Sequence, residues 1–287
     1  MSARLIAIAI LTLTIWTTVF VLDMPTVNAA PLGIINGRDV QSDEQLGVVG
    51  LLLADVDNLY DAQFCGGTLI DAEWVLTAAH CTFDLAFSPF AAADLDVIVG
   101  SQQLHSGLGE RIAVDRIVRH HNFDFETYYN DIALLHLAKA AAMTPVAVVD
   151  ADANLDTDAT LGLVLGWGVM KSGFGATTLQ QAELPIVAQQ DCASFYARQG
   201  YHVIDSILCA GYRTGGIDAC AGDSGGPMMV WDEAEEVWVQ VGIISAGAGC
   251  AEPGYFGLYT RLSDFAEWIT QTTESEPIVV SRLRIYR

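Results

Sequence analysis

Residues 216–229, GIDACAGDSGGPMM, place an aspartate, a serine and several glycines side by side. Gly and Asp both weaken a β-strand, so this segment specifies something other than regular structure. A serine nucleophile must stand exposed on a sharp turn, with backbone N–H groups converging where negative charge develops. Glycines permit both the turn and the close approach. Ser224 is therefore the candidate nucleophile.

A serine hydroxyl is a weak nucleophile unless a neighbouring base removes its proton. Of the six histidines, His80 ends the apolar run WVLTAAHC, directly before Cys81, which could fix its position through a disulfide. The other five lie in polar or alternating contexts, where surface or packing roles are expected: His105, His120, His121, His136 and His202. His80 is the candidate base.

The imidazole in turn needs a buried carboxylate, which holds its tautomer and stabilises the imidazolium. Asp131 precedes the apolar run IALLHL, which would bury it, and a buried charge is costly unless it is paired. The candidate triad thus follows the chain order His80, Asp131, Ser224.

The composition narrows the possible partners. The 287 residues are 52% hydrophobic and 17% charged, which excludes disorder throughout the chain. Thirteen Lys and Arg against 35 Asp and Glu give a formal charge of -22, which repels nucleic acid and anionic lipid and favours cationic partners. The simplest reading is that this charge keeps an exported protein soluble.

The first 29 residues are interpreted as a secretory signal peptide. Arg4 precedes an apolar run from Leu5 to Leu22, and small residues around Ala29 supply a cleavage site. Because 18 apolar residues just span a bilayer, an uncleaved membrane anchor is the alternative. Export implies an oxidising compartment, where six cysteines form three disulfides in one of 15 connectivities. A metal site would need close pairs such as Cys-x-x-Cys, and the sequence has none.

Short apolar runs separated by turn residues, such as LGVVGLLLA, LDVIVG and VWVQVGIISAG, predict an all-β sandwich or barrel. Long helices are expected to be scarce. The clearest helix signal is FAEWITQTT, which Ser263 or Asp264 can cap and in which Leu262, Phe265 and Ile269 repeat at helical spacing; AQQDCASFYARQG is a second, shorter candidate. Residues 139–160 lack periodicity and suit a crossing between two β-domains, with the boundary near Pro145. The tail, residues 274–287, carries three arginines in its last six residues and is expected to fray rather than dock on the acidic body.

Eight ordered segments of this chain resemble the chymotrypsin-like (trypsin-type) serine proteases. They extend from residue 34 to about residue 272: IING, CGGTLI, LTAAHC, NDIALL, GWG, LCAGY, DACAGDSGGP and GLYTRL. The resemblance implies two six-stranded antiparallel β-barrels, over residues 34–145 and 146–273, with a C-terminal helix in the second. It places His80 and Asp131 on the first barrel and Ser224 on the second, with the active site in the cleft between them.

The resemblance also assigns roles to other residues. The backbone N–H groups of Gly222 and Ser224 would form the oxyanion hole. The family's disulfides map to three pairs that use every cysteine: Cys65 with Cys81, Cys192 with Cys209, and Cys220 with Cys250.

Asp218 corresponds to the floor of the family's primary specificity pocket. A desolvated carboxylate there would be stabilised by a substrate Arg or Lys, so cleavage is expected after basic residues. Gly247 and Gly257 match wall positions that must stay small. Ala219 replaces a serine of many trypsins, which tilts the expected preference toward arginine. Without a pocket role, Asp218 would be a loop residue next to a cysteine.

Two further positions and one loop follow from the same comparison. Ser245 is expected to hydrogen-bond Asp131. Ala246 stands where the family usually has a tryptophan, so binding of residues upstream of the cleaved bond should be weaker. The segment GSQQLHSGLGER lacks most acidic ligands of the family's calcium loop, so no calcium and no other metal are expected.

Ile34 and Asp223 correspond to the family's activation switch, in which a freed N-terminal ammonium pairs with the buried aspartate. The residue before Ile34 is Gly33, where such precursors usually carry Arg or Lys. A pocket built on Asp218 should not cleave after Gly, so self-activation is not expected. Residues 30–33 would form a short propeptide that another peptidase removes.

The sequence therefore predicts an exported trypsin-like serine endopeptidase that acts through an acyl-enzyme, without a cofactor, as a monomer. Its partners would be protein or peptide substrates with Arg or Lys, proteinaceous inhibitors and an activating peptidase. One alternative is an inert, protease-like binding protein for basic partners. An α/β-hydrolase esterase fails, because the order of the triad is wrong and strands do not alternate with helices.

Overall fold

The computed structural model describes residues 34–41 and 46–274. The expected signal peptide, the propeptide and the tail beyond residue 274 lie outside the described residues. Within the described ranges, no helix is long and apolar enough to cross a membrane.

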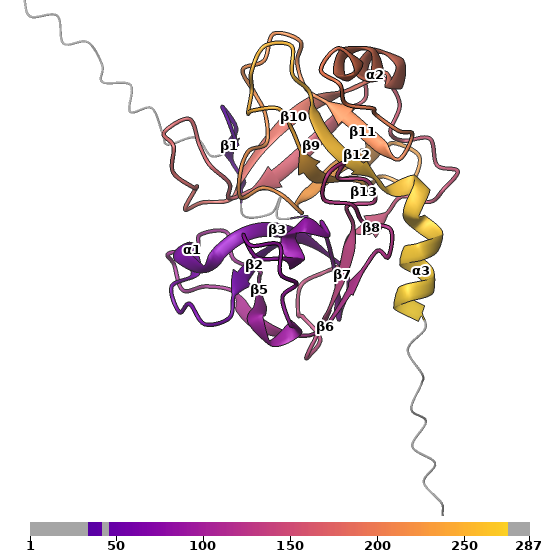
Figure 1. Ribbon diagram of the computed structural model, residues 1–287. Helices are drawn as coiled ribbons and strands as arrows, with labels where there is room; N and C mark the ends of the chain where they lie inside the picture. The colour runs from indigo at the N-terminus through magenta and orange to yellow at the C-terminus, as the bar shows by residue number, and fades with distance from the viewer. Residues whose placement is uncertain (1–33, 42–45, 275–287) are drawn as a thin grey trace, which may run out of the picture. The chain divides into compact units, whose positions relative to one another are not determined.

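The first barrel is a closed, antiparallel, six-stranded sheet with the order β2-β3-β4-β7-β6-β5 (Figure 1). Its strands carry the apolar runs that predicted β structure, and their inward side chains, such as Leu51, Leu76 and Leu134, are fully buried. The strands are β2 (Val48–Leu53), β3 (Gln63–Asp71), β4 (Trp74–Thr77), β5 (Leu95–Val99), β6 (Glu110–Arg119) and β7 (Ala133–Leu137).

The second barrel is closed by the antiparallel pairing of β9 with β10. Its strands are β9 (Leu161–Gly166), β10 (Gln180–Val187), β11 (Ile207–Ala210), β12 (Pro227–Asp232), β13 (Val237–Ala246) and β14 (Gly257–Arg261). Two short strands extend this sheet: β1 (Arg38–Asp39) pairs with β10, and β8 (Ala147–Val148) pairs in parallel with β13. The predicted fold of two six-stranded barrels is confirmed.

The segment before the first barrel thus contributes a strand to the second, which the division at residues 34–145 and 146–273 did not anticipate. The last strand of the first barrel ends at Leu137, and the second barrel begins at Leu161. The boundary near Pro145 falls in this connection and stays a prediction.

Helices are few and short: α1 (Leu59–Ala62), α2 (Gln189–Ala197) and α3 (Ala266–Glu274). A 3₁₀ turn over Leu262–Phe265 leads into α3, and Leu262, Phe265 and Ile269 are buried at the helical spacing that the sequence showed. The rings of Phe265 and Trp268 both contact His120 of the first barrel, with centroids 5.3 Å apart in each case. The C-terminal helix therefore ties the end of the second barrel back to the first.

The two barrels meet backbone to backbone at a pair of glycines. A Cβ placed on Gly66 of β3 would lie 3.0 Å from Cα and 3.1 Å from the backbone nitrogen of Gly226. The Gly66 N–H donates to the Ser224 carbonyl at 2.7 Å, two residues before that contact. This junction fixes the turn that carries Ser224 against the first barrel.

Candidate active site

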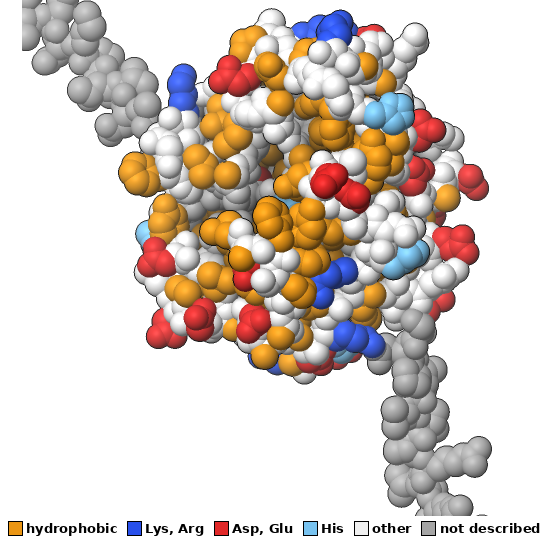
Figure 2. Space-filling model, in the orientation of Figure 1, with side chains coloured by type: hydrophobic (Ala, Val, Ile, Leu, Met, Phe, Trp, Pro, Cys, Tyr) orange, Lys and Arg blue, Asp and Glu red, His pale blue; other side chains and the backbone are white. Residues whose placement is uncertain are grey.

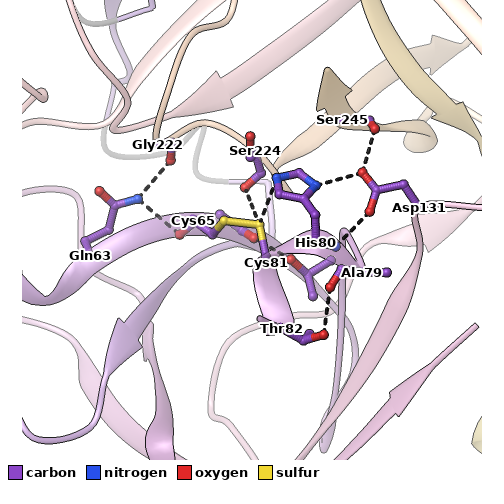
Figure 3. Close-up of a disulfide and its surroundings, with 12 residues drawn as sticks. Gln63, Cys65, Ala79, His80, Cys81, Thr82, Asp131, Gly222, Ser224 and Ser245 are labelled. Carbon is purple, nitrogen blue, oxygen red and sulfur yellow. Dashed lines mark hydrogen bonds and ion pairs between the residues drawn. A yellow bond between two sulfur atoms is a disulfide. The ribbon is translucent and has the colours of Figure 1, made fainter. Parts of the chain in front are cut away.

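His80 and Asp131 are brought together by neighbouring strands of the first barrel. His80 opens a 3₁₀ turn after β4, and Asp131 directly precedes β7, which pairs with β4. Asp131 is fully buried, and its Oδ2 lies 2.7 Å from His80 Nδ1 while its Oδ1 accepts the His80 backbone N–H at 2.8 Å (Figure 3). The expected contact from Ser245 is present, since its Oγ donates to Asp131 Oδ2 at 2.5 Å.

The contact with Asp131 determines which ring nitrogen of His80 carries the proton. A carboxylate opposite Nδ1 holds the proton on that nitrogen and leaves Nε2 as an acceptor. Burial lowers the pKa of His80, but the charge and hydrogen bond of Asp131 outweigh it, and the pKa stands above its ordinary value. His80 is therefore suited to act as a base, with a pKa that Asp131 raises.

Ser224 lies on a tight turn immediately before β12, beside the His80 imidazole (Figure 3). The next residue, Gly225, has φ +82°, and a Cβ there would lie 2.3 Å from Thr77 Oγ1 and 2.4 Å from the Gly66 carbonyl. Only glycine fits this turn. Among the described residues Ser224 Oγ makes no hydrogen bond to His80 Nε2, a bond that is often long in enzymes without substrate. Both side chains line one cavity of about 380 Å³.

Two backbone N–H groups beside Ser224 are available to a ligand. Gly222 has φ +92°, and a Cβ on it would lie 3.1 Å from Gly168 Cα. Within the described part of the chain, neither the Gly222 nor the Ser224 N–H has a protein acceptor. Free amide donors next to a nucleophile suit an oxyanion that forms only during reaction.

The cavity that holds His80 and Ser224 extends to Asp218, which is 7% exposed. Its Oδ2 accepts the Ala251 N–H at 2.9 Å, and burial raises the pKa of Asp218 to about 6. A Cβ on Gly257 would lie 3.3 Å from Asp218 Oδ1 and 3.0 Å from the ring of Tyr259, so a side chain there would fill the space. The remaining residues expected at this pocket also line the cavity: Ala219, Ser245, Ala246 and Gly247.

Asp223 is a third buried carboxylate, on the turn before Ser224. It accepts the backbone N–H of Gly168 at 2.7 Å and of Cys220 at 2.9 Å. Among the described residues it forms no ion pair, and burial raises its pKa to about 7. Ile34 is fully buried, and the following Ile35 bridges to the backbone of Asp218. The chain just after the expected cleavage point is thus packed beside Asp218 and the cavity that it lines.

The structure contains the three disulfides that the resemblance implies, Cys65–Cys81, Cys192–Cys209 and Cys220–Cys250. The single group of closely spaced potential metal ligands in the described ranges is Cys65, His80 and Cys81. Since both cysteines are oxidised, they offer no thiolates to a metal. The first disulfide instead anchors His80 to β3, as its position before Cys81 suggested.

Sequence reasoning missed two contacts of the triad. The Tyr128 ring packs edge-on against His80, with centroids 5.6 Å apart, and Thr260 Oγ1 donates to the Asp131 carbonyl at 2.7 Å. Thr260 lies in the motif GLYTRL, but nothing in that motif indicates which residue it contacts. The other histidines lie elsewhere, as expected; His136, for example, pairs with Asp115 on the first barrel at 2.7 Å.

Comparisons with known proteins agree with this geometry. The Trypsin family model matches residues 34–269. The chain is 36% identical to Trypsin-1 of Salmo salar over 217 residues, which cover 74% of this chain and 82% of that protein. It is 34% identical to Trypsin I-P1 of Gallus gallus, also over 217 residues, covering 74% and 80% of the two chains. The chain belongs to the trypsin family and is a serine endopeptidase.

Proposed function

We propose that this protein is an exported endopeptidase that cleaves peptide bonds after Arg, and less readily after Lys, through an acyl-enzyme. One observation carries the proposal: a single cavity is lined by His80, Ser224 and Asp218, a buried carboxylate that forms no ion pair among the residues the structure describes. That combination places a cation-binding group within one substrate side chain's length of a nucleophile and its base.

In the proposed mechanism, Ser224 Oγ attacks the carbonyl carbon of the scissile bond while His80 Nε2 takes its proton. Asp131 holds the Nδ1 proton and stabilises the imidazolium. The N–H groups of Gly222 and Ser224 bind the oxyanion. His80 then protonates the leaving amine, the C–N bond breaks, and an ester to Ser224 remains. A water molecule, deprotonated by His80, hydrolyses this ester and restores the serine.

Specificity in this proposal comes from Asp218. A guanidinium or ammonium group that enters the cavity pairs with a carboxylate that the protein has already desolvated, so the substrate supplies the missing counter-charge. Ala219 offers no hydroxyl to an ammonium group, which favours Arg. Ala246 leaves the adjoining wall small, which weakens contacts with upstream residues.

The acidic character of the molecule supports basic substrates. The formal charge is -22, and acidic side chains are scattered over the visible face (Figure 2). Such a field raises the encounter rate with cationic partners at low ionic strength. Export is supported by the three disulfides and by the signal-like residues 1–29. Proteinaceous inhibitors of trypsins are expected partners, and the enzyme is expected to act as a monomer.

The test combines a fluorophosphonate probe with a mixed peptide library, applied to the mature enzyme. Labelling that is lost in Ser224→Ala, together with cleavage after Arg and Lys, supports the proposal. An inert protein that only binds basic partners would remain unlabelled and would leave every peptide intact. Labelling with cleavage after apolar residues would retain the peptidase and refute the basic specificity.

Activation is expected to require removal of everything before Ile34. The buried Asp223 would then pair with the new ammonium group, which orders the turn at Gly222 and Ser224. The measurement is N-terminal sequencing of the exported protein, in parallel with active-site titration. A fully active chain that begins at Ala30 would refute the switch. A chain that begins at Ile34 without added peptidase would refute the dependence on another enzyme.

The pH profile should show two ionisations on its acid side. His80 must be neutral to act as a base, and its pKa stands above the ordinary value; Asp218 must be charged to bind Arg, and its pKa is about 6. Both requirements fail as the pH falls. The decline of kcat/KM for an Arg substrate should therefore become steeper at lower pH and approach about a hundredfold per pH unit. The measurement is kcat/KM from about pH 5 to 9. A profile that stays flat down to pH 5 would contradict both assignments.

A further inference from the structure

The geometry points to Gln63 as a positioning residue for the oxyanion hole, a role that rests on the function proposed above. Gln63 is the first residue of β3 and lies half-buried, on the opposite side of Cys65 from His80. Its side-chain amide reaches from the first barrel to the second, where Nε2 donates to the Gly222 carbonyl at 2.9 Å (Figure 3).

Both hydrogens of this amide nitrogen are used. Nε2 also donates to the Cys65 carbonyl on its own strand at 3.0 Å. Cys65 in turn is joined by its disulfide to Cys81, which follows His80. One hydrogen of the NH₂ group is therefore bonded to the strand that anchors the base, and the other is bonded to the backbone of the proposed oxyanion hole.

The peptide groups on both sides of Gly222 are held in this way. The preceding group is fixed because the Val169 N–H donates to the Ala221 carbonyl at 2.7 Å. In a trans peptide the N–H points opposite to the C=O, so the Gly222 N–H is directed away from Val169. The following group is held at its carbonyl by Gln63 and at its N–H, that of Asp223, by the Cys220 carbonyl at 3.0 Å. A glycine at φ +92° has no side chain to restrict it, so its N–H direction depends on these backbone contacts, and Gln63 supplies the one that comes from the first barrel.

An oxyanion donor acts only if it is aimed correctly before the reaction begins. Loss of the Gln63 bond should let Gly222 turn, which weakens binding of the tetrahedral state and leaves the Asp218 pocket unchanged. Gln63 would thus act on kcat through Gly222 and would not contact the substrate's basic side chain.

The test uses the mature enzyme and Gln63→Met, which keeps the length of the side chain and removes both N–H donors. We expect kcat to fall on the order of 10- to 100-fold, with KM for an Arg substrate changed less than about threefold. The affinity for a peptide aldehyde ending in Arg, which forms a tetrahedral adduct, should fall in parallel with kcat. The affinity for benzamidine, which needs only the pocket, should stay the same.

Gln63→His, which restores a donor, should recover part of kcat. Gln189→Met is the matched control, because Gln189 Nε2 also donates to a backbone carbonyl, that of Ile204 at 2.9 Å, but on α2. It should leave the ratio of aldehyde to benzamidine affinity unchanged. Equal losses of both affinities in Gln63→Met, or no loss of kcat, would overturn the role of Gln63. If the wild-type enzyme neither reacts with fluorophosphonate nor binds the aldehyde, the proposed function itself fails.

Discussion

Asp131→Asn is expected to lower kcat on the order of 10⁴-fold and to leave KM for an Arg substrate nearly unchanged. The carboxylate accepts hydrogen bonds from His80 and Ser245 in a fully buried site. An asparagine keeps the shape, but its NH₂ group turned toward Nδ1 would favour the tautomer that carries the proton on Nε2. His80 could then no longer accept the proton of Ser224. The measurement is steady-state kinetics corrected by active-site titration.

The chain offers a matched control for this substitution. Asp115 also pairs with a histidine Nδ1, that of His136, at the same 2.7 Å, but on the outer side of the first barrel. Asp115→Asn should leave kcat within about twofold, since exposed pairs contribute little. If Asp131→Asn kept kcat within tenfold of the wild type, the proposed division of roles between His80 and Asp131 would be wrong.

Asp218→Ser is expected to reduce kcat/KM for Arg substrates on the order of 10³-fold, and to reverse the preference between Arg and apolar residues. A cation in this cavity would lose the buried counter-charge that Asp218 supplies, at a cost of about 3–5 kcal/mol. Benzamidine inhibition should weaken in proportion, because it uses the same carboxylate. The measurement is kcat/KM for paired peptides that differ only in Arg or Met before the cleaved bond.

Net charge must be separated from the local effect of Asp218. Asp232→Ser removes the same charge from the hairpin between β12 and β13, where Asp232 accepts the backbone N–H groups of Ala234 and Glu235 in its own turn. It should change kcat/KM less than about twofold at physiological ionic strength. An unchanged Arg preference in Asp218→Ser would mean that another group recognises the substrate's basic side chain.

The local motifs were sufficient to select the candidate groups that the structure brings together. The glycines around Ser224 indicate a tight turn because of their own conformational freedom, and His80 before Cys81 suggests an anchored base. The late helix was predictable because Leu262, Phe265 and Ile269 repeat at its period. In each case the physical signal lies within a dozen residues. The arrangement of the two barrels came from the family resemblance and not from periodicity.

Contacts between distant segments had no such signal. Gln63 and Gly222 are 159 residues apart, and Thr260 and Asp131 are 129 apart, so their pairing depends on the register and packing of both barrels. The pairing of β1 with β10 likewise joins the first described strand to a sheet that begins more than a hundred residues later. An amide or a hydroxyl has many possible partners, and the sequence alone does not select among them.

At the contact of Gly66 with Gly226, no side chain separates the backbones of the two barrels. A methyl group on Gly66 would press on the Gly226 backbone, whereas a methyl group on Gly226 would meet the Asp223 and Leu165 carbonyl oxygens of its own barrel at 2.9 Å. With a methyl group on Gly66, each barrel could still close, but the contact between the barrels would widen. The distance between Ser224 and His80 would then increase. The placement of Ser224 beside His80 therefore depends on a direct backbone contact between two glycines, which leaves no room for a methyl group on Gly66.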